Sequence, residues 1–264
     1  MFAEAEENNL GGKVKDQRWA RWHRCSLCEQ KYHGIVHCAL GWACWKTYVG
    51  RPETDEVRQI AMNVLGLGLD SADHDVDALS VREAELAMRQ RVGGSAHNIL
   101  AVQANLACTY GKLGRDEEAS EIERDVFRGR LELNGGEHEK TLRAAFNYAS
   151  SLARLERFEE AKELMRITMP AARRVLGETR ELMLRMKKVY ADALYMDPAT
   201  LDELREAVTT LEDTERTARR VFGISHPTTV GVEHSLQNAR AALRESGDVE
   251  SIREAVGAMT ARDA

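Results

Sequence analysis

The chain repeats itself at an interval of about 42 residues, and this period constrains the fold more than any other feature of the sequence. An alanine followed sixteen residues later by a glycine occurs four times, as Ala78 and Gly94, Ala119 and Gly135, Ala161 and Gly177, and Ala207 and Gly223. The glycines are 41, 42 and 46 residues apart. Four copies of one unit at a nearly fixed period indicate a modular solenoid, in which each unit packs on its neighbours.

Each repeat contains two helical patterns separated by a short break. The first pattern of one repeat places apolar residues three or four positions apart, which forms one stripe along a helix: Ile99, Val102, Leu106, Tyr110 and Leu113. A break near residues 114–116 follows, and acidic residues there and just after it suit the start of a second helix. We predict a glycine in the left-handed αL conformation where each second helix ends, as at Gly135. Pro170 is predicted to kink or break the helix over 158–176, because proline removes a backbone donor.

The residues inside the repeats resemble those of a known family. One repeat contains Asn-Leu-Ala at 105–107, Tyr110, Leu-Gly-Arg at 113–115, Glu-Glu-Ala at 117–119 and then Gly-x-x-His. This pattern is similar to the 42-residue tetratricopeptide repeat of kinesin light chains. The resemblance implies an all-α fold, a right-handed α-solenoid of antiparallel helix pairs that forms a tetratricopeptide-like superhelix. It also implies a non-enzymatic interaction or scaffold module, which binds a peptide or protein in the concave groove of the repeats.

Four polar residues on the first helices are the predicted peptide-binding residues. In the family that these repeats resemble, an asparagine of the first helix reaches the ligand backbone, and Asn105 and Asn147 match that position. Arg143 and Lys188 lie on equivalent helices, beside the packing alanines. In the third repeat the equivalent of the asparagine is about Val189, so the polar clamp is incomplete there. A structural interpretation also stays open, in which both asparagines form hydrogen bonds with neighbouring backbone groups.

Other repeated residues favour structural roles. Small or aromatic residues at fixed repeat positions are interpreted as contacts between closely packed helices: Ala107, Ala119, Ala149, Ala161, Ala207 and Tyr110. The histidines of the Gly-x-x-His pattern are interpreted as helix-entry caps or loop contacts rather than ligands: His97, His138 and His226.

Four of the five cysteines cluster near the N-terminus. The spacing Cys25-x2-Cys28-x4-His33-x4-Cys38 supplies three thiolates and one imidazole, which can complete a tetrahedral zinc shell. We predict that these four residues bind zinc within a small Cys/His-rich cap, with Cys44, His23 and His37 as alternative ligands. The competing interpretation is a buried helix over 37–48, in which Cys38 and Cys44 are packed thiols. A catalytic or redox-sensing Cys25 or Cys28 is a third hypothesis.

A basic segment with two tryptophans surrounds the start of this cluster. Residues 11–31 carry six basic and two acidic side chains, with Trp19 and Trp22 among them. Such a segment can bind single-stranded RNA through charge and stacking, so an RNA-binding protein is the alternative function. The whole chain has a net charge of −6, which disfavours nucleic acid as a partner. We expect instead that an amphipathic helix docks both tryptophans on the first repeat.

We expect four segments along the chain. These are an N-terminal tail at 1–20, the cap at 21–52, the repeat solenoid at 53–245, and a C-terminal helix or tail at 246–264. The last repeat helix is expected near 228–244, and four extra residues fall in a loop near 196–199. No run of about 18 apolar residues and no basic-then-apolar leader pattern occurs, so we expect an intracellular, cytoplasmic protein with no membrane segment.

Two local motifs are set aside. Gly66-Leu67-Gly68 lacks the third glycine and the preceding strand of a dinucleotide loop, and it is expected to be helical. Residues 73–77 alternate acidic positions as in a calcium loop, but Ala78 stands where the turn glycine is needed. We expect a turn between helices at this position.

Overall fold

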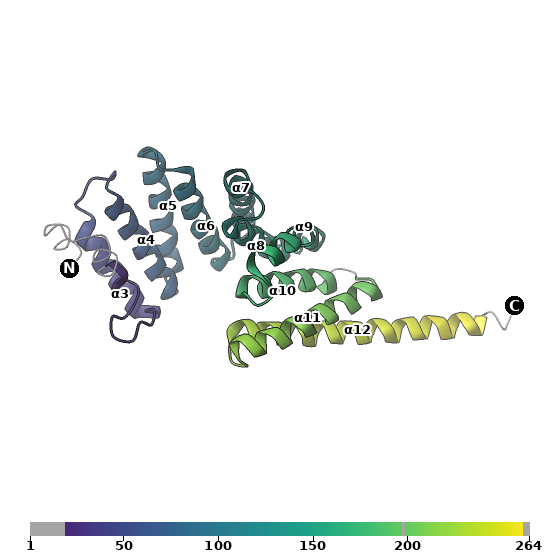
Figure 1. Cartoon of the computed structure of the whole chain (residues 1–264). Coiled ribbons are helices and arrows are strands. Elements are labelled where there is room, and N and C mark those ends of the chain that lie inside the picture. The colour runs from purple at the N-terminus through teal and green to yellow at the C-terminus, as the bar shows by residue number, and fades with distance from the viewer. Residues whose placement is uncertain (1–18, 197–198, 261–264) are drawn as a thin grey trace. The chain divides into compact units, whose positions relative to one another are not determined.

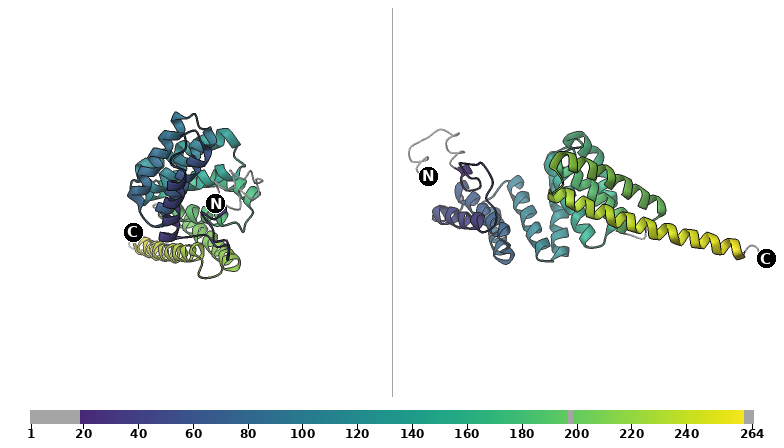
Figure 2. Two further views of the ribbon diagram at one scale, coloured as in Figure 1. Left: turned by 90° about the vertical axis from the view of Figure 1, so that its left-hand side faces the viewer. Right: turned by 90° about the horizontal axis from the view of Figure 1, so that it is seen from below.

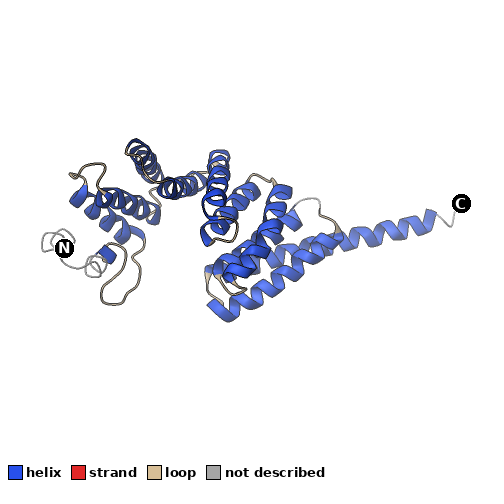
Figure 3. Cartoon of the chain, turned by 45° about the horizontal axis from the view of Figure 1, so that its top comes forward, coloured by secondary structure: helices blue, strands red, loops and turns tan. Residues whose placement is uncertain are grey.

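The all-α prediction is confirmed. The structure is a computed structural model that describes residues 19–196 and 199–260, with side chains up to residue 247, and every regular element in these ranges is a helix (Figure 3). The predicted tail at 1–20 and the loop residues Asp197 and Pro198 lie almost entirely outside the described residues. Within the described part, no helix combines the length and the apolar character needed to cross a membrane.

The chain divides into two compact units, which we describe separately. The first unit, residues 1–122, contains α3 (Gly34–Tyr48), α4 (Glu56–Ser71), α5 (Asp75–Arg91) and α6 (Ala96–Lys112) (Figure 1). Helix α7 (Asp116–Asn134) begins in the first unit and ends in the second. The second unit, residues 123–264, also contains α8 (Glu139–Arg154), α9 (Phe158–Leu176), α10 (Glu181–Met196), α11 (Leu201–Phe222) and α12 (Pro227–Thr260).

The order of the helices follows the sequence repeats. Helices α4–α5, α6–α7, α8–α9 and α10–α11 fall on the four repeats, and α12 follows as the first helix of a further unit. The two helices of a repeat pack on each other in α4–α5, α8–α9 and α10–α11. The repeated alanines Ala78, Ala119, Ala161 and Ala207 are all 0% exposed. Their predicted role as packing residues is therefore confirmed.

Positive φ angles recur with the repeat and correct one predicted position. Gly93, Gly135, Gly177 and Gly223 have φ of 69°, 76°, 71° and 85°. The first of these is Gly93, not the predicted Gly94, because the tandem glycines of that loop offer two candidates one residue apart. The spacing from Gly93 to Gly135 and on to Gly177 is then 42 residues in both steps.

The backbone at these glycines also differs from the predicted αL conformation. Gly177 has ψ of 175° and Gly223 has ψ of 170°, so both combine positive φ with an extended ψ. This region is open essentially to glycine alone. The αL prediction is therefore wrong at these two helix ends, and the requirement for glycine is stricter than predicted.

A second set of positive φ angles marks the turn inside each repeat. Asp73, Gly114 and Glu156 have φ of 57°, 72° and 58°, at equivalent positions between α4 and α5, α6 and α7, and α8 and α9. The acidic stretch at 73–77 is thus the inter-helix turn and the start of α5, as expected. Pro170 was predicted to kink or break its helix, and it does not break it, because α9 runs without interruption from Phe158 to Leu176 with Pro170 exposed inside it. A kink stays a prediction.

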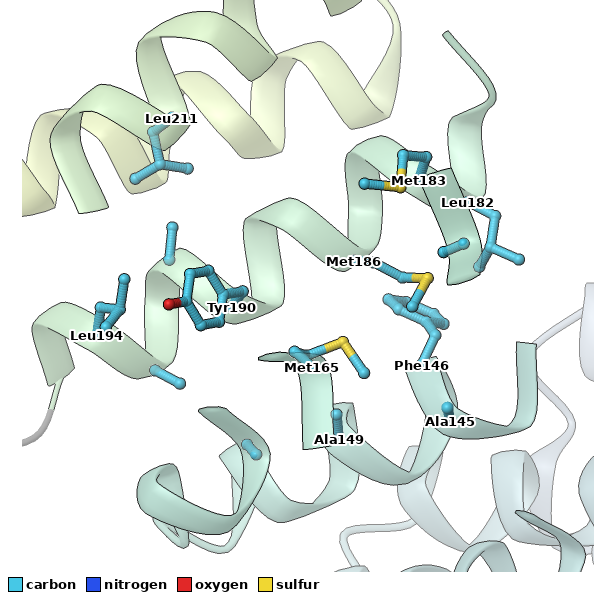
Figure 4. Packing of buried hydrophobic residues seen from close by; sticks show 14 of the residues in the cluster. Ala145, Phe146, Ala149, Met165, Leu182, Met183, Met186, Tyr190, Leu194 and Leu211 are labelled. Atoms are coloured by element: carbon cyan, nitrogen blue, oxygen red, sulfur yellow. The ribbon is translucent and has the colours of Figure 1, made fainter. Parts of the chain in front are cut away.

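Methionine, leucine and alanine fill the core of the second unit (Figure 4). Met165 of α9, Met183 and Met186 of α10 and Ala149 of α8 are each 0% exposed, and Phe146 is 7% exposed. Consecutive helices from α8 to α12 pack on one another, and α10 also contacts α8 and α12. First helices of consecutive repeats therefore form one layer in this unit.

Glycines bring α3 and α4 close together in the first unit. A Cβ on Gly41 would lie 3.1 Å from the carbonyl oxygen of Val64, and a Cβ on Gly68 would lie 2.8 Å from the carbonyl oxygen of His37. A Cβ on Gly66 would meet the guanidinium carbon of Arg82 at 2.8 Å. The Gly66-Leu67-Gly68 motif thus lies within α4 and serves close packing, as expected for a helical segment.

Helix α12 is longer than predicted. It runs from Pro227 to Thr260 as one helix, well past the expected end near 244 (Figures 1 and 2). The expected boundary between residues 245 and 246 falls inside this helix. Whether it separates two segments of the chain stays a prediction.

Candidate functional site

The candidate site lies on the layer of first helices in the second unit, α8, α10 and α12. The sequence folds this way because each of these helices turns its alanine and leucine face inward, as at Ala145, Ala191 and Val232, which are all 0% exposed. The opposite sides of the helices are left free of the core. They carry the polar residues that the sequence marks as binding candidates.

A cavity of about 420 Å³ opens where the three helices meet. Its apolar wall comes from Phe146 of α8, Val189 of α10 and Pro227 at the start of α12. Arg185 and Lys188 of α10 add two cations, and Glu181, Thr228 and Gly231 complete the lining. The cavity can hold an apolar side chain and place it beside positive charge.

Both cations of the cavity are held by contacts within it or beside it. The guanidinium of Arg185 lies over the ring of Phe146, with 4.6 Å from its central carbon to the ring centroid. The Lys188 ammonium donates to the carboxylate of Asp192 at 2.6 Å. The one acid of the lining, Glu181, accepts a hydrogen bond of 2.9 Å from the hydroxyl of Thr228. Lys188 is thus paired with a carboxylate, whereas Arg185 is the cation of the lining that meets an aromatic ring.

The four predicted peptide-binding residues fall in three places. Lys188 lines the cavity directly. Arg143 and Asn147 lie four residues apart on α8; Arg143 is exposed and donates to Glu139 at 2.9 Å, and Asn147 is half-buried. Asn105 is half-buried on α6 of the first unit, and its backbone carbonyl oxygen accepts a hydrogen bond from the Thr109 hydroxyl at 3.2 Å. Their role in binding stays a prediction.

A larger cavity of about 550 Å³ lies elsewhere in the second unit. It is lined by charged or polar side chains from the end of α9, from α10 and from α11: Arg173, Glu178, Lys187, Asp213, Arg216, Thr217 and Arg220. Glu178 already pairs there with both Arg173 and Lys187, at 2.5 Å. Without an apolar wall, this cavity is the weaker candidate for a peptide side chain.

The four predicted zinc ligands are not brought together. Cys38 is 4% exposed and packs in α3 against Leu65 and Leu69, whereas Cys28 is exposed in a hairpin before α3. Among the described residues, no group of three or more His, Cys, Asp or Glu side chains is arranged to hold a metal ion. The buried-thiol interpretation holds for Cys38 and for Cys44, which is 0% exposed and whose pKa burial raises to about 12. Zinc binding stays a prediction of the spacing alone.

Histidines gather beside the hairpin. The rings of His23 and His37 meet edge to face with 6.3 Å between centroids. Burial lowers the pKa of both rings, and the neighbouring charge of His33 lowers the pKa of His37 further. His23 and His37 are therefore biased toward the neutral form near pH 7.

The two tryptophans of the basic segment dock on α3 and on α4, which is the first helix of the first repeat, as expected. Trp19 and Trp22 pack against the buried cluster of Cys44, Tyr48, Ala61 and Val64. The rings of Trp19 and Tyr48 are 5.8 Å apart between centroids. These contacts cover part of each ring, and the RNA-binding alternative gains no support from them.

Comparison with known proteins identifies the type of repeat. Residues 99–139, from α6 to the start of α8, match the family model of the tetratricopeptide repeat. The Q17M form of a kinesin light chain with nearly identical TPR-like repeats from Podosopora anserina matches with a TM-score of 0.61 and 22% identity, over 78% of this chain and 95% of that chain. BtubC (BKLC) from P. vanneervenii matches with a TM-score of 0.61 and 16% identity, over 83% and 91% of the two chains.

The fold is a kinesin-light-chain-like tetratricopeptide repeat fold. A Rap protein complexed with competence and sporulation factor has a related structure, with a TM-score of 0.51 and 15% identity, over 80% of this chain and 59% of that one. Among curated proteins, no sequence matches this chain.

Within the tetratricopeptide repeats, sequence reasoning missed Arg185 and Phe146 as residues of the site. Phe146 carries the apolar spacing of a core residue, and Arg185 has the pattern of a solvated charge. Their stacking becomes visible only when α8 and α10 are placed side by side. The histidine caps were predicted correctly at two positions: Nδ1 of His138 accepts from the Lys140 N–H at 3.1 Å, and Nδ1 of His226 accepts from the Thr228 N–H at 3.2 Å. His97 instead lies inside α6, after the cap Ser95.

Proposed function

We propose that this chain is a non-enzymatic interaction module, which binds a peptide or protein segment on the face formed by α8, α10 and α12. The observation that carries the proposal is the cavity of about 420 Å³, where three consecutive first helices supply an apolar wall and two cations. Tetratricopeptide repeats suit this task because stacked units present a continuous binding surface. The Rap protein of related fold, complexed with competence and sporulation factor, is consistent with such a role.

The chemistry of the cavity indicates the kind of segment that would bind. Phe146, Val189 and Pro227 can surround one apolar side chain, and burial of such a side chain supplies the affinity. Arg185 and Lys188 flank this position and favour carboxylates on neighbouring ligand residues. We therefore expect a ligand segment with an apolar anchor beside Asp or Glu.

The predicted polar residues extend this surface along the helices. Asn147 offers an amide that can bond ligand backbone, and Arg143 offers a second exposed cation on α8. Asn105 belongs to α6 of the first unit, and its role in binding stays a separate prediction. We also propose that this function is carried out inside the cell.

A peptide library displayed on phage would test the proposal directly. Selection on the full chain should enrich peptides with an apolar residue next to acidic ones. Arg185→Glu should weaken binding of the enriched peptides about tenfold or more, because it places a like charge beside the ligand carboxylates. Arg216→Glu is the matched control: it reverses another exposed arginine, in the other cavity, and should leave binding unchanged. Equal binding to both variants would contradict the proposal.

The asparagines offer a second test with a different readout. Replacing Asn105 and Asn147 with Ala should leave the melting temperature nearly unchanged and weaken peptide binding by about 1–3 kcal/mol, the usual range for lost hydrogen bonds of buried groups. Unfolding with normal binding per folded molecule would instead make both asparagines structural.

A further inference from the structure

We propose that Cys25 and Cys28 form a peroxide-sensitive dithiol, which closes into a disulfide within the hairpin that precedes α3. This site is separate from the proposed binding face and does not depend on it. It uses two thiols that the core leaves accessible.

The hairpin brings the two cysteines together through backbone hydrogen bonds. Arg24 and Lys31 form an antiparallel bridge, and the Cys25 N–H donates to the Gln30 carbonyl at 2.8 Å. The turn is closed by the Glu29 N–H, which donates to the Cys25 carbonyl at 2.9 Å, with Glu29 at φ of 57°. In this turn the Cys28 side chain reaches the Cys25 sulfur in a hydrogen bond. The two sulfurs are thus already neighbours before any bond forms between them.

The Cys25 sulfur sits among hydrogen-bond donors. The backbone N–H of Cys28 and that of Leu27 donate to it, and so does the hydroxyl of Tyr32. Hydrogen-bond donors placed around a sulfur atom stabilise negative charge on it. A thiolate is the reactive form of cysteine, so Cys25 is the expected nucleophile.

A cavity gives small molecules access to this sulfur. It has a volume of about 390 Å³ and is lined by Cys25 together with Arg21, Arg24, Ser26, Glu29 and Ala20. Two guanidinium groups in the lining add positive charge near the thiolate. Cys28 is exposed on the same turn and can act as the resolving thiol.

The other three cysteines provide an internal contrast. Cys38 and Cys44 are buried, and burial raises the pKa of Cys44 to about 12, so neither meets the conditions for reaction. Cys108 is exposed on α6 but has no second cysteine near it in sequence. Accessibility and a neighbouring thiol combine only at Cys25 and Cys28 among the five.

The chemistry balances with hydrogen peroxide as the oxidant. The Cys25 thiolate attacks one peroxide oxygen, the O–O bond breaks, and sulfenic acid and hydroxide form. The Cys28 sulfur then attacks the Cys25 sulfur, a disulfide forms, and the sulfenic oxygen leaves as water with the proton of the Cys28 thiol. Overall, two thiols lose two hydrogens, and one peroxide becomes two waters.

Trypsin and mass spectrometry can read this reaction from one fragment. Cleavage after Arg24 and Lys31 releases residues 25–31, which contain both cysteines and no others. After brief peroxide treatment of the full chain, this fragment should lose the mass of two hydrogens and resist alkylation. Cys38 and Cys44 should still be alkylated once the protein is unfolded.

Two variants test the roles of the individual thiols. Cys28→Ser should stop the reaction at a sulfenic acid on Cys25 that dimedone traps, and Cys108→Ser should change nothing in the fragment. A fragment that keeps both thiols while Cys108 reacts would overturn the proposal. So would about one zinc ion per purified chain that is lost in Cys25→Ser, because bound metal would occupy the same thiolates and support the zinc prediction instead.

Discussion

The two units of this molecule share one repeat but stabilise it with different interiors. Between α4 and α5 the first unit buries charge: Arg82 and Glu85 are 0% exposed and Arg89 is 7% exposed. Between α9 and α10, the second unit buries Met165, Met183 and Met186 instead. The turn glycines and the buried alanines of the repeat recur in both. A tetratricopeptide backbone therefore does not dictate the chemistry of its core.

The buried charges of the first unit are paired. Glu85 accepts from Arg89 at 3.0 Å and from Arg82 at 3.4 Å, while Arg82 also donates to Asp70 at 2.9 Å. Arg89 donates further to the side chain of Gln59 at 3.2 Å. Compared with an apolar core, such a network adds little to the free energy of unfolding. Removal of one member, however, lowers this free energy strongly, because it leaves a buried charge unpaired. The difference between the units should therefore appear in how they respond to single substitutions.

The largest effect is expected at the centre of the network. Glu85→Ala should lower the free energy of unfolding by about 3–5 kcal/mol, because it leaves Arg82 and Arg89 buried without their shared partner. Urea unfolding followed by circular dichroism measures this loss. Replacing Arg82, Glu85 and Arg89 together by Met, Leu and Met should cost far less than Glu85→Ala alone. If the triple variant is the less stable of the two, the network is a net source of stability and the comparison is wrong.

A smaller loss, of about 2–4 kcal/mol, is expected for Met186→Ala in the second unit. The substitution removes apolar contacts and leaves a cavity, but it leaves no charge unpaired. Met186→Leu, which nearly conserves volume, is the matched control and should cost less than about 1.5 kcal/mol. The same unfolding measurement applies. A loss for Met186→Ala above that for Glu85→Ala would remove the proposed distinction between the cores.

The glycine turns should behave alike in both units, because they depend on the backbone and not on the core. Gly93→Ala and Gly177→Ala should each cost about 1–3 kcal/mol, since both glycines have positive φ. Gly136→Ala is the control, because Gly136 is exposed, lacks positive φ, and leaves room for a Cβ. It should change stability by less than about 0.5 kcal/mol. Gly135→Val should likewise cost at least about 1 kcal/mol.

The smallest effect is expected from an ion pair that joins α9 to α11 in the second unit. Lys162 donates to Glu203 at 2.7 Å, and this bond is the main cause that lowers the pKa of Glu203 to about 2. A depressed carboxyl pKa stabilises the folded state above the unfolded value, about 4.3, and this contribution disappears as pH falls toward 2. Lys162→Met should remove about 1 kcal/mol or less at pH 7 and flatten stability between pH 5 and 2. An unchanged pH profile would show that the pair is fully screened.

The sequence predicted the helix pairs and their packing alanines well, because both follow from a period and a residue size. It placed the first turn glycine one residue late, since Gly93 and Gly94 are indistinguishable without φ angles. The buried charges were not predicted. Arg82, Glu85 and Arg89 have the spacing of a solvated helix face. Only contact with polar groups of α4, those of Gln59 and Asp70, makes them interior.

The candidate sites show the same limit. Lys188 was predicted and lines the cavity. Arg185 was not predicted, because its place in the site depends on stacking on the ring of Phe146, which comes from another helix. Cysteine spacing suggested four ligands, but the close approach of α3 to α4 at Gly41 and Gly68 sets Cys38 into the core. Three-dimensional contacts of this kind leave no periodic signal in a single sequence.

Hydrogen–deuterium exchange tests the proposed binding face most directly. The full chain would be measured alone and with a saturating peptide from the library selection. We predict slower exchange in α8, in α10 and in the first turns of α12, with little change in α9 and α11. Protection confined to α9 and α11, around Arg173 and Arg216, would contradict the account and move the binding site to the other cavity.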